Sequence, residues 1–271
     1  MARNRFATRT DLRIAYETRG RWWLNRQWLV LIMGLGFDRE GWTPILKGLQ
    51  RHFRLVLIDN RGCGRSSVPA RPFTVADLAA DVIAVLDDAR IEQANVFGIS
   101  LGGMVAQRVA IDYPRRVQRL ILGCTTPGWP IAHPMPAPAL RLLASSSHQS
   151  REVLVRRTVE NALSPTTLEQ RPELVDSLIE HQRHRPTSPA AWSALAAAGA
   201  GYFSSPDRLP IHAPTLVLHG DADTVVDPRN ATLLARRIKD AELVRIPGAG
   251  HLFFWEQPEL VVREIRRFLR S

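Results

Sequence analysis

The sequence predicts an α/β fold with a mainly parallel central sheet, helices on both of its faces and an inserted helical cap. Short apolar runs, which are typical of buried strands, alternate along the chain with longer amphipathic stretches. The alternation stops near residue 123 and resumes near residue 215, and the residues between show only helical patterns. Apolar strands that alternate with helices favour a parallel sheet covered on both faces.

The expected strands are the apolar runs at residues 28–33, 54–58, 94–97, 117–122, 215–218 and 242–246. Helices are expected over residues 39–51, 74–89, 229–238 and 258–269. Another helix begins at Ser100 and ends before Pro114. Thr74 and Asp77 have the spacing of a capping pair, which marks where one of these helices begins.

Residues 127–210 are predicted to be the cap, and residues 1–126 and 211–271 the core. The cap opens with a proline-rich run and continues with helical patterns near 138–146, 150–163, 168–184 and 189–203. A cap that closes over a pocket also lines it with apolar side chains, so Trp129 and Trp192 are candidate substrate-binding residues. The cap arginines are expected on the solvated sides of these helices: Arg141, Arg151, Arg156, Arg157, Arg171, Arg183 and Arg185.

The composition is that of an ordinary globular protein. Of the 271 residues, 45% are hydrophobic and 23% are charged. No apolar run approaches the roughly 20 residues of a membrane span, and the N-terminus lacks the apolar region of a secretory signal. Two cysteines, Cys63 and Cys124, make no disulfide framework. We therefore expect a cytoplasmic protein with no membrane span.

The net charge of +10 comes almost entirely from arginine, which raises the question of nucleic-acid binding. The arginines are scattered as pairs, such as Arg115-Arg116 and Arg266-Arg267, among apolar residues of expected helices. This pattern indicates solvated helix faces rather than one basic patch. We expect no nucleic-acid partner.

The segment Gly98-Ile99-Ser100-Leu101-Gly102 carries the strongest functional signal. It follows an apolar strand directly and opens a helix. A serine on such a tight strand-to-helix turn projects from the sheet edge, and the glycines allow backbones to approach closely. Ser100 is therefore the predicted nucleophile.

A serine hydroxyl needs a base, and His251 is the predicted one. It lies on a glycine-rich loop, Pro247-Gly248-Ala249-Gly250-His251, just after the last expected strand. His219, at a strand end, and His52, at a helix end, are weaker alternatives, with local packing or hydrogen bonding expected for His219.

The acid that orients the histidine is expected between Ser100 and His251 in the sequence. Asp223 is the predicted acid, because it follows a strand by a few residues and can reach back toward the His251 loop. Asp221 is better suited to holding the turn, and Asp227 to capping the next helix. The other place for an acid, residues 123–127, has no carboxylate.

Two backbone N–H groups should stabilise the negative charge that develops on a substrate oxygen. Leu101, which follows the nucleophile, offers one. Leu35, in the loop Met33-Gly34-Leu35-Gly36 after the first expected strand, offers the other.

The segment 59–66 also contains glycines, charges and a cysteine, but it lacks the spacing of a phosphate loop. Asp59 and Arg61 are interpreted as parts of a structural turn. The sequence shows no metal-ligand spacing and no dinucleotide fingerprint, so no metal and no cofactor are expected.

These motifs together resemble the α/β-hydrolase fold superfamily over essentially the whole chain, and most closely its bacterial esterase and enol-lactonase-like branch. The residues that carry the resemblance lie at 34–36, 59–66, 98–103, 123–128, 220–223 and 250–251. Many relatives have a histidine where this chain has Met33. Relatives with a cap over the active site match residues 127–210.

The resemblance implies acyl transfer to water on Ser100, with His251 as base and Asp223 orienting it. Dehalogenases and epoxide hydrolases of this fold use an aspartate at the nucleophile position, so Ser100 argues against both. An ester or lactone hydrolase acting on a small molecule is expected. The alternatives are C–C bond hydrolysis, cofactor-free perhydrolysis or acyl transfer with the same residues, and a ligand receptor with negligible turnover.

Overall fold

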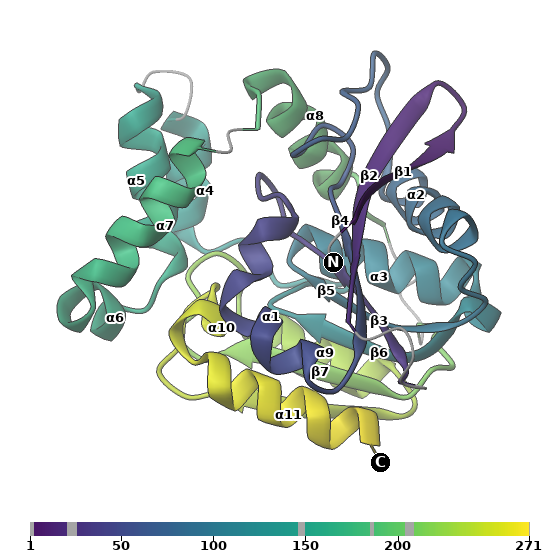
Figure 1. Ribbon diagram of the computed structural model, residues 1–271. Coiled ribbons are helices and arrows are strands. Elements are labelled where there is room, and N and C mark those ends of the chain that lie inside the picture. Colours follow the sequence, from purple (N-terminus) through teal and green to yellow (C-terminus); the bar gives the residue numbers. More distant parts are fainter. Residues whose placement is uncertain (1–2, 21–25, 146–149, 185–186, 204–208, 271) are drawn as a thin grey trace.

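An eight-stranded sheet forms the centre of the computed structural model, which describes residues 3–20, 26–145, 150–184, 187–203 and 209–270 (Figure 1). The strand order is β1-β2-β4-β3-β5-β6-β7-β8. The six strands from β4 to β8 in this order are parallel. They are β3 (Trp28–Ile32), β4 (Arg54–Ile58), β5 (Ala94–Ile99), β6 (Val117–Gly123), β7 (Thr215–Gly220) and β8 (Ala241–Ile246). The predicted fold class is confirmed.

Two strands at the N-terminus extend the sheet beyond the predicted elements. β1 (Arg3–Arg9) pairs antiparallel with β2 (Leu12–Arg19), and β2 pairs antiparallel with β4. β1 is rich in arginine, and β2 has only a short alternation of apolar residues, at Leu12, Ile14 and Tyr16, so neither strand has the continuous apolar run of the predicted strands. Hydrogen bonding to the edge of the parallel sheet, rather than a sequence pattern, defines this pair.

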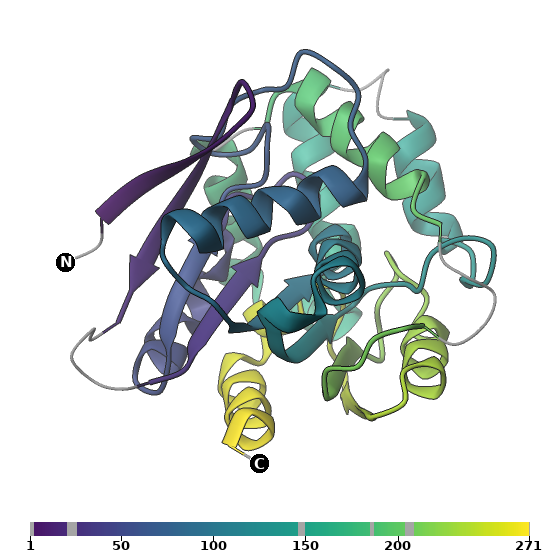
Figure 2. The same cartoon turned by 90° about the vertical axis from the view of Figure 1, so that its right-hand side faces the viewer.

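The two faces of the sheet carry separate hydrophobic cores because strand side chains alternate in direction. Val30 and Ile32 face one core, and Leu29 and Leu31 face the other. The first core is covered by α2 (Val75–Asp88), α3 (Leu101–Asp112) and α9 (Arg229–Arg237), with α2 and α3 toward the viewer in Figure 2. The second is covered by α1 (Thr43–Gln50), α10 (Phe253–Glu256) and α11 (Pro258–Arg270).

Helix α2 begins where the sequence predicts. The Thr74 hydroxyl accepts a hydrogen bond from the Asp77 N–H, and the Asp77 carboxylate accepts one from the Thr74 N–H. This reciprocal capping satisfies two backbone donors that have no partner inside the helix. Short helical turns η1 (Arg39–Trp42) and η2 (Pro114–Arg116) precede α1 and β6.

The described residues between β6 and β7 form five helices, which make up the inserted region; Figure 1 shows them in teal and green. They are α4 (Ala137–Ser145), α5 (Arg151–Ala162), α6 (Pro165–Gln170), α7 (Pro172–His184) and α8 (Pro189–Ala200). The single helix expected at 168–184 is divided, because Arg171 precedes a proline and leaves the helical conformation. Buried residues of α8 join the first core, whereas those of α5 and α7 join the second.

The loop at residues 59–66 is structural, as predicted. The buried Asp59 carboxylate accepts hydrogen bonds from the N–H groups of Arg39 and Arg65. Arg61 makes two hydrogen bonds of 2.7 Å to the buried Asp81 on α2. Paired, hydrogen-bonded charges of this kind fix loop geometry, because removing one partner would leave a buried charge uncompensated.

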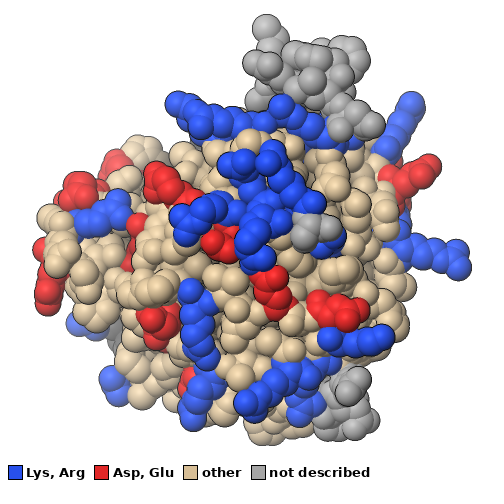
Figure 3. Space-filling view, turned by 90° about the horizontal axis from the view of Figure 1, so that it is seen from below, with Lys and Arg blue, Asp and Glu red and all other residues tan. Residues whose placement is uncertain are grey.

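Four arginines, Arg26, Arg51, Arg266 and Arg270, gather around His52, and other basic side chains lie apart from this group. Figure 3 shows them across the face seen from below, with acidic side chains among them. Arg267, for example, pairs with Glu242 and Glu264. In the residues that the structure describes, no helix has the length and apolar character needed to cross a membrane.

Candidate active site

Ser100 lies at the turn from β5 into α3. Its backbone has φ 55° and ψ −122°, a conformation that non-glycine residues seldom adopt. The Ser100 N–H donates to the Gly123 carbonyl at the end of β6 (2.8 Å), and the Thr125 hydroxyl donates to the Ser100 carbonyl (2.7 Å). The neighbouring strand therefore holds the strained turn, and strain of this kind concentrates at functional sites.

Close backbone contacts explain the two glycines that flank Ser100 in the motif. A Cβ on Gly98 would lie 2.0 Å from the Gly102 carbonyl oxygen, and a Cβ on Gly102 would lie 2.2 Å from that of Ile32. Both distances are far below van der Waals contact. The motif therefore brings β5, the first turn of α3 and the end of β3 together, with Ser100 beside Gly34.

Asp223 and His251 are brought together by the loops after β7 and β8. The Asp223 Oδ2 atom lies 2.8 Å from His251 Nδ1. The two loops touch at Gly220, where a Cβ would lie 2.2 Å from the Gly250 carbonyl oxygen. The exposed Asp221 also ties them, because its Oδ1 accepts a hydrogen bond of 2.7 Å from the Gly248 N–H.

The other two candidate positions for the acid make the contacts predicted for them. Asp221 holds the turn, as just described, and Asp227 accepts a hydrogen bond from the Arg229 N–H (2.8 Å) at the start of α9. Neither carboxylate has a hydrogen bond to His251 among the described residues.

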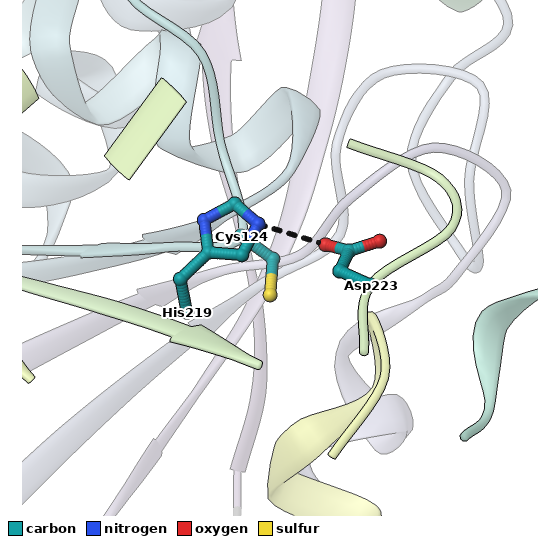
Figure 4. A group of neighbouring side chains, drawn as sticks. All are labelled: Cys124, His219 and Asp223. Atoms are coloured by element: carbon teal, nitrogen blue, oxygen red, sulfur yellow. Dashed lines mark ion pairs between the residues drawn. The ribbon is translucent and has the colours of Figure 1, made fainter. Parts of the chain in front are cut away.

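Asp223 has a second histidine neighbour, His219, which was not predicted from the sequence. His219 is fully buried, and its Nε2 lies 3.0 Å from Asp223 Oδ2 and 3.1 Å from the Val226 carbonyl oxygen. Cys124, at the end of β6, completes a group of three buried side chains whose ligand-type atoms lie within 4.8 Å of one another (Figure 4). The signal in the sequence was the i, i+4 spacing of His219 and Asp223 around Gly220.

The Asp223 carboxylate is held in its charged form. Burial would raise its pKa, but the charge of His251 and hydrogen bonds from His219 and His251 lower the pKa below its ordinary value. Its Oδ1 atom also accepts the N–H groups of Val225 (2.8 Å) and Val226 (3.0 Å). N–H groups or ring nitrogens thus lie within 3.0 Å of both oxygens of this buried carboxylate.

The two cysteines are poor nucleophiles. Burial raises the pKa of the Cys63 thiol to about 11, and burial together with the Asp223 charge raises the pKa of Cys124 well above its ordinary value. Thiols react as thiolates, so both side chains are unreactive near neutral pH.

Two backbone N–H groups, one in the turn of Ser100 and one in the loop that contacts this turn at Gly34, have no acceptor among the described residues. Within the described parts of the chain, the N–H groups of Leu35 and Leu101 donate to no other residue. The Asn60 side chain donates to the Met33 carbonyl (2.9 Å) and fixes the loop that carries Leu35. The Met33 side chain is buried in the second core. The side-chain hydrogen bond that holds this loop's backbone is therefore the one from Asn60.

The inserted helix α8 lies directly over these loops. A Cβ on Gly36 would lie 3.2 Å from the Trp192 ring, and a Cβ on Gly199 would lie 3.2 Å from the Leu101 side chain. Trp129, by contrast, is 59% exposed and forms an isolated bridge with Phe203, which follows α8. Of the two candidate tryptophans, Trp192 is the one that contacts the loop of Leu35.

The loop of His251 rests on the inserted region as well. Glu256 is buried and accepts hydrogen bonds from the Gly250 N–H (2.7 Å) and from the hydroxyls of Ser164 (2.6 Å) and Thr167 (2.5 Å). The Leu252 N–H donates to the Ala162 carbonyl (3.0 Å). The turn between α5 and α6 therefore braces the histidine loop.

Ser100 and His251 are not joined by a hydrogen bond in the described residues. Catalytic hydrogen bonds are commonly long or misaligned before substrate binds, and they tighten in the reacting complex. Ser100 and His251 are nevertheless connected through β6, because Gly123 accepts from Ser100 and the Cys124 thiol lies 4.0 Å from the Gly250 carbonyl oxygen.

Comparisons with known proteins agree on one family. The family model described as "alpha/beta hydrolase fold" matches residues 27–258. A poly(3-hydroxyalkanoate) depolymerase of Ectopseudomonas oleovorans is 32% identical, over 90% of this chain and 84% of its own. A 3-oxoadipate enol-lactonase of Acinetobacter baylyi is 28% identical, over 93% and 91% of the two chains. The crystal structure of a hydrolase from Pseudomonas aeruginosa is 30% identical and superimposes with a TM-score of 0.86, covering 99% of this chain and 98% of that one.

The contacts at Gly102 predict that Gly102→Ala destroys the site. A Cβ there meets the backbone of β3, which cannot move without shifting the Leu35 loop. We expect a fall of several degrees in Tm, since overpacking costs about 1–3 kcal/mol, and loss of hydrolase turnover. Gly201→Ala is the matched control, because its Cβ would lie 3.4 Å from the nearest atom. A Gly102→Ala variant with normal Tm and turnover would refute the close-contact argument.

Proposed function

Because the chain belongs to the α/β-hydrolase fold family, we propose that it is a serine hydrolase that cleaves carboxylic esters or lactones. The observation that carries the proposal is the buried Asp223–His251 pair at the same sheet edge as the strained Ser100 turn. An acid, a histidine and a serine in these positions supply an orienting carboxylate, a base and a nucleophile. The names of relatives, which include an enol-lactonase, support a carboxylic ester or lactone as substrate.

In the proposed first half-reaction, the Ser100 Oγ attacks the substrate carbonyl carbon, and His251 Nε2 takes the hydroxyl proton. Asp223 orients the ring through Nδ1 and stabilises the imidazolium that forms. The carbonyl oxygen becomes negative and accepts hydrogen bonds from the N–H groups of Leu35 and Leu101. The tetrahedral intermediate then expels the alcohol, which takes the proton from His251, and leaves an ester of Ser100.

Water completes the cycle in the second half-reaction. His251 takes a proton from a water molecule, whose oxygen attacks the carbonyl carbon of the Ser100 ester. The intermediate uses the same two N–H donors, and its collapse breaks the bond to Ser100 Oγ. The serine takes the proton back from His251, and the carboxylic acid leaves.

The proposed cap, residues 127–210, favours an uncharged apolar substrate. Arg141, Arg156, Arg157 and Arg183 are exposed, and Arg171 donates to the Glu256 carbonyl (2.9 Å). The Arg151 side chain and Arg185 lie outside the described residues. Trp192 is the nearest described cap aromatic to the Leu35 loop, and we propose that it contacts the acyl group. Trp129 is proposed as a second contact, at the outer surface.

Replacing the nucleophile tests the mechanism directly. Ser100→Ala should reduce ester turnover by at least about a thousandfold, since the serine and histidine act as a unit, while Tm changes little. A fluorophosphonate probe should label the wild-type protein and not this variant. Ser193→Ala, an exposed serine on α8, is the control and should keep full turnover and labelling. Comparable turnover in the Ser100→Ala variant would exclude the proposed mechanism.

The identity of the acid is tested by three single amides. Asp223→Asn should lower kcat by several powers of ten, about 10⁴ where this change has been best characterised, because the amide favours the wrong histidine tautomer. Asp221→Asn and Asp227→Asn should cost much less, since Asp221 binds the Gly248 N–H and Asp227 binds the N–H and guanidinium of Arg229, and neither binds His251 in the described residues. Steady-state kinetics on one soluble ester decides the order. Should Asp227→Asn prove the most damaging, the assignment is wrong.

The substrate class is tested by comparing kcat/KM for a neutral ester with that for an analogue bearing a distal carboxylate. We expect the neutral ester to be preferred. An arginine that waits in the empty pocket for a carboxylate would be a buried charge without a partner, which is costly. The described cap arginines instead lie outward or are hydrogen-bonded to the protein. A tenfold or greater preference for the carboxylate, erased by one cap arginine-to-alanine change, would establish the opposite specificity.

A further inference from the structure

We propose that His219 is a positioning residue for the acid, so that Asp223 works between two histidines rather than with one. The inference rests on the proposed function, because it concerns how Asp223 orients His251. The proposed mechanism of Ser100, His251 and Asp223 does not itself require a second histidine.

The contacts of His219 fix the direction of its hydrogen bond. Its Nε2 lies 3.0 Å from Asp223 Oδ2 and 3.1 Å from the Val226 carbonyl oxygen. Both neighbours accept hydrogen bonds, so Nε2 must carry a hydrogen and donate. Nδ1, the other ring nitrogen, is buried and has no hydrogen-bond partner among the described residues. The geometry therefore assigns the tautomer with hydrogen on Nε2.

The shared atom gives His219 its influence on the reaction. Asp223 Oδ2 is bound by His251 and lies 3.0 Å from the His219 Nε2, whose single N–H it shares with the Val226 carbonyl, whereas Oδ1 accepts from the N–H groups of Val225 and Val226. These four N–H groups surround the carboxylate, and His219 restrains the oxygen that His251 uses. A donor on Oδ2 also disperses its negative charge, which limits how strongly His251 holds a proton.

The surroundings add few other charges. The titratable groups next to His219 in the described residues are Cys124 from β6 and Asp223 from its own loop, and His251 and Glu256 lie beyond them. The Cys124 thiol stays protonated, because burial raises its pKa well above the ordinary value.

Loss of the His219 donor should have two effects with one cause. The carboxylate gains freedom to rotate, so kcat falls by about tenfold, the worth of one charge-assisted hydrogen bond. Its charge is also more concentrated on Oδ2, so His251 holds its proton to higher pH. Because serine attack needs neutral His251, kcat/KM is expected to fall at low pH, where His251 is protonated. This acid limb of the pH profile should then move to higher pH by about half a unit or more. A residue that only filled space would lower kcat through instability and leave the limb in place.

Two substitutions separate hydrogen bonding from packing. His219→Gln keeps an N–H donor near the position of Nε2, and His219→Met fills similar volume without one. For the glutamine variant, we expect kcat within about threefold of wild type and an unmoved acid limb. For the methionine variant, we expect both the fall in kcat and the upward shift of the acid limb. Thr224→Val is the matched control, because it removes a hydrogen bond from the same loop to Asn161 and leaves all four donors of Asp223. It should leave the acid limb unmoved.

A measurement on the wild-type protein covers the case in which His219→Met does not fold. In ¹⁵N-histidine-labelled protein, the His219 Nε2 should carry an exchange-protected proton, and that signal should be missing from His219→Gln. A hydrogen on Nδ1 with none on Nε2 would overturn the proposal. So would a folded His219→Met variant with an unmoved acid limb. If Ser100→Ala were fully active instead, the proposed function would fail whatever the His219 variants do.

Discussion

The site depends on a carboxylate that has been removed from water and still carries its charge. Burial of Asp223 favours the neutral acid, and the charge of His251 together with the donors around Asp223 reverses that preference. Those donors come from three places in the chain: the end of β7, the loop that follows it and the loop after β8. The position of the acid is therefore a property of the whole sheet edge and not of residue 223 alone.

Much of this arrangement is predictable from the sequence, because it depends on local spacing. The nucleophile motif must follow a strand and open a helix, and close approach at Gly98 and Gly102 leaves no alternative to glycine. Thr74 and Asp77 are three residues apart, as reciprocal capping requires. The roles of Asp221 and Asp227 also follow from their neighbours in the chain.

Other features could not be predicted, because they depend on contacts between distant segments. The N-terminal strands lack a strong apolar pattern and are held by pairing with β4. The sequence predicts only local packing or hydrogen bonding for His219. Its contact with Asp223 is local, but the sequence does not indicate that Asp223 is also the partner of His251. Nothing in the sequence indicates that the inserted helices divide between two cores on opposite faces of the sheet.

The support that Glu256 receives has a consequence for how this fold can diversify. Its carboxylate joins the histidine loop to the turn between α5 and α6, so the inserted region is part of the frame that carries His251. An inserted region exchanged from another protein would have to bring hydroxyl donors at the positions of Ser164 and Thr167, or else leave the buried Glu256 carboxylate with backbone donors alone. Variation in this part of the chain is therefore easier in α8, which carries Trp192, than in the turn beneath the histidine.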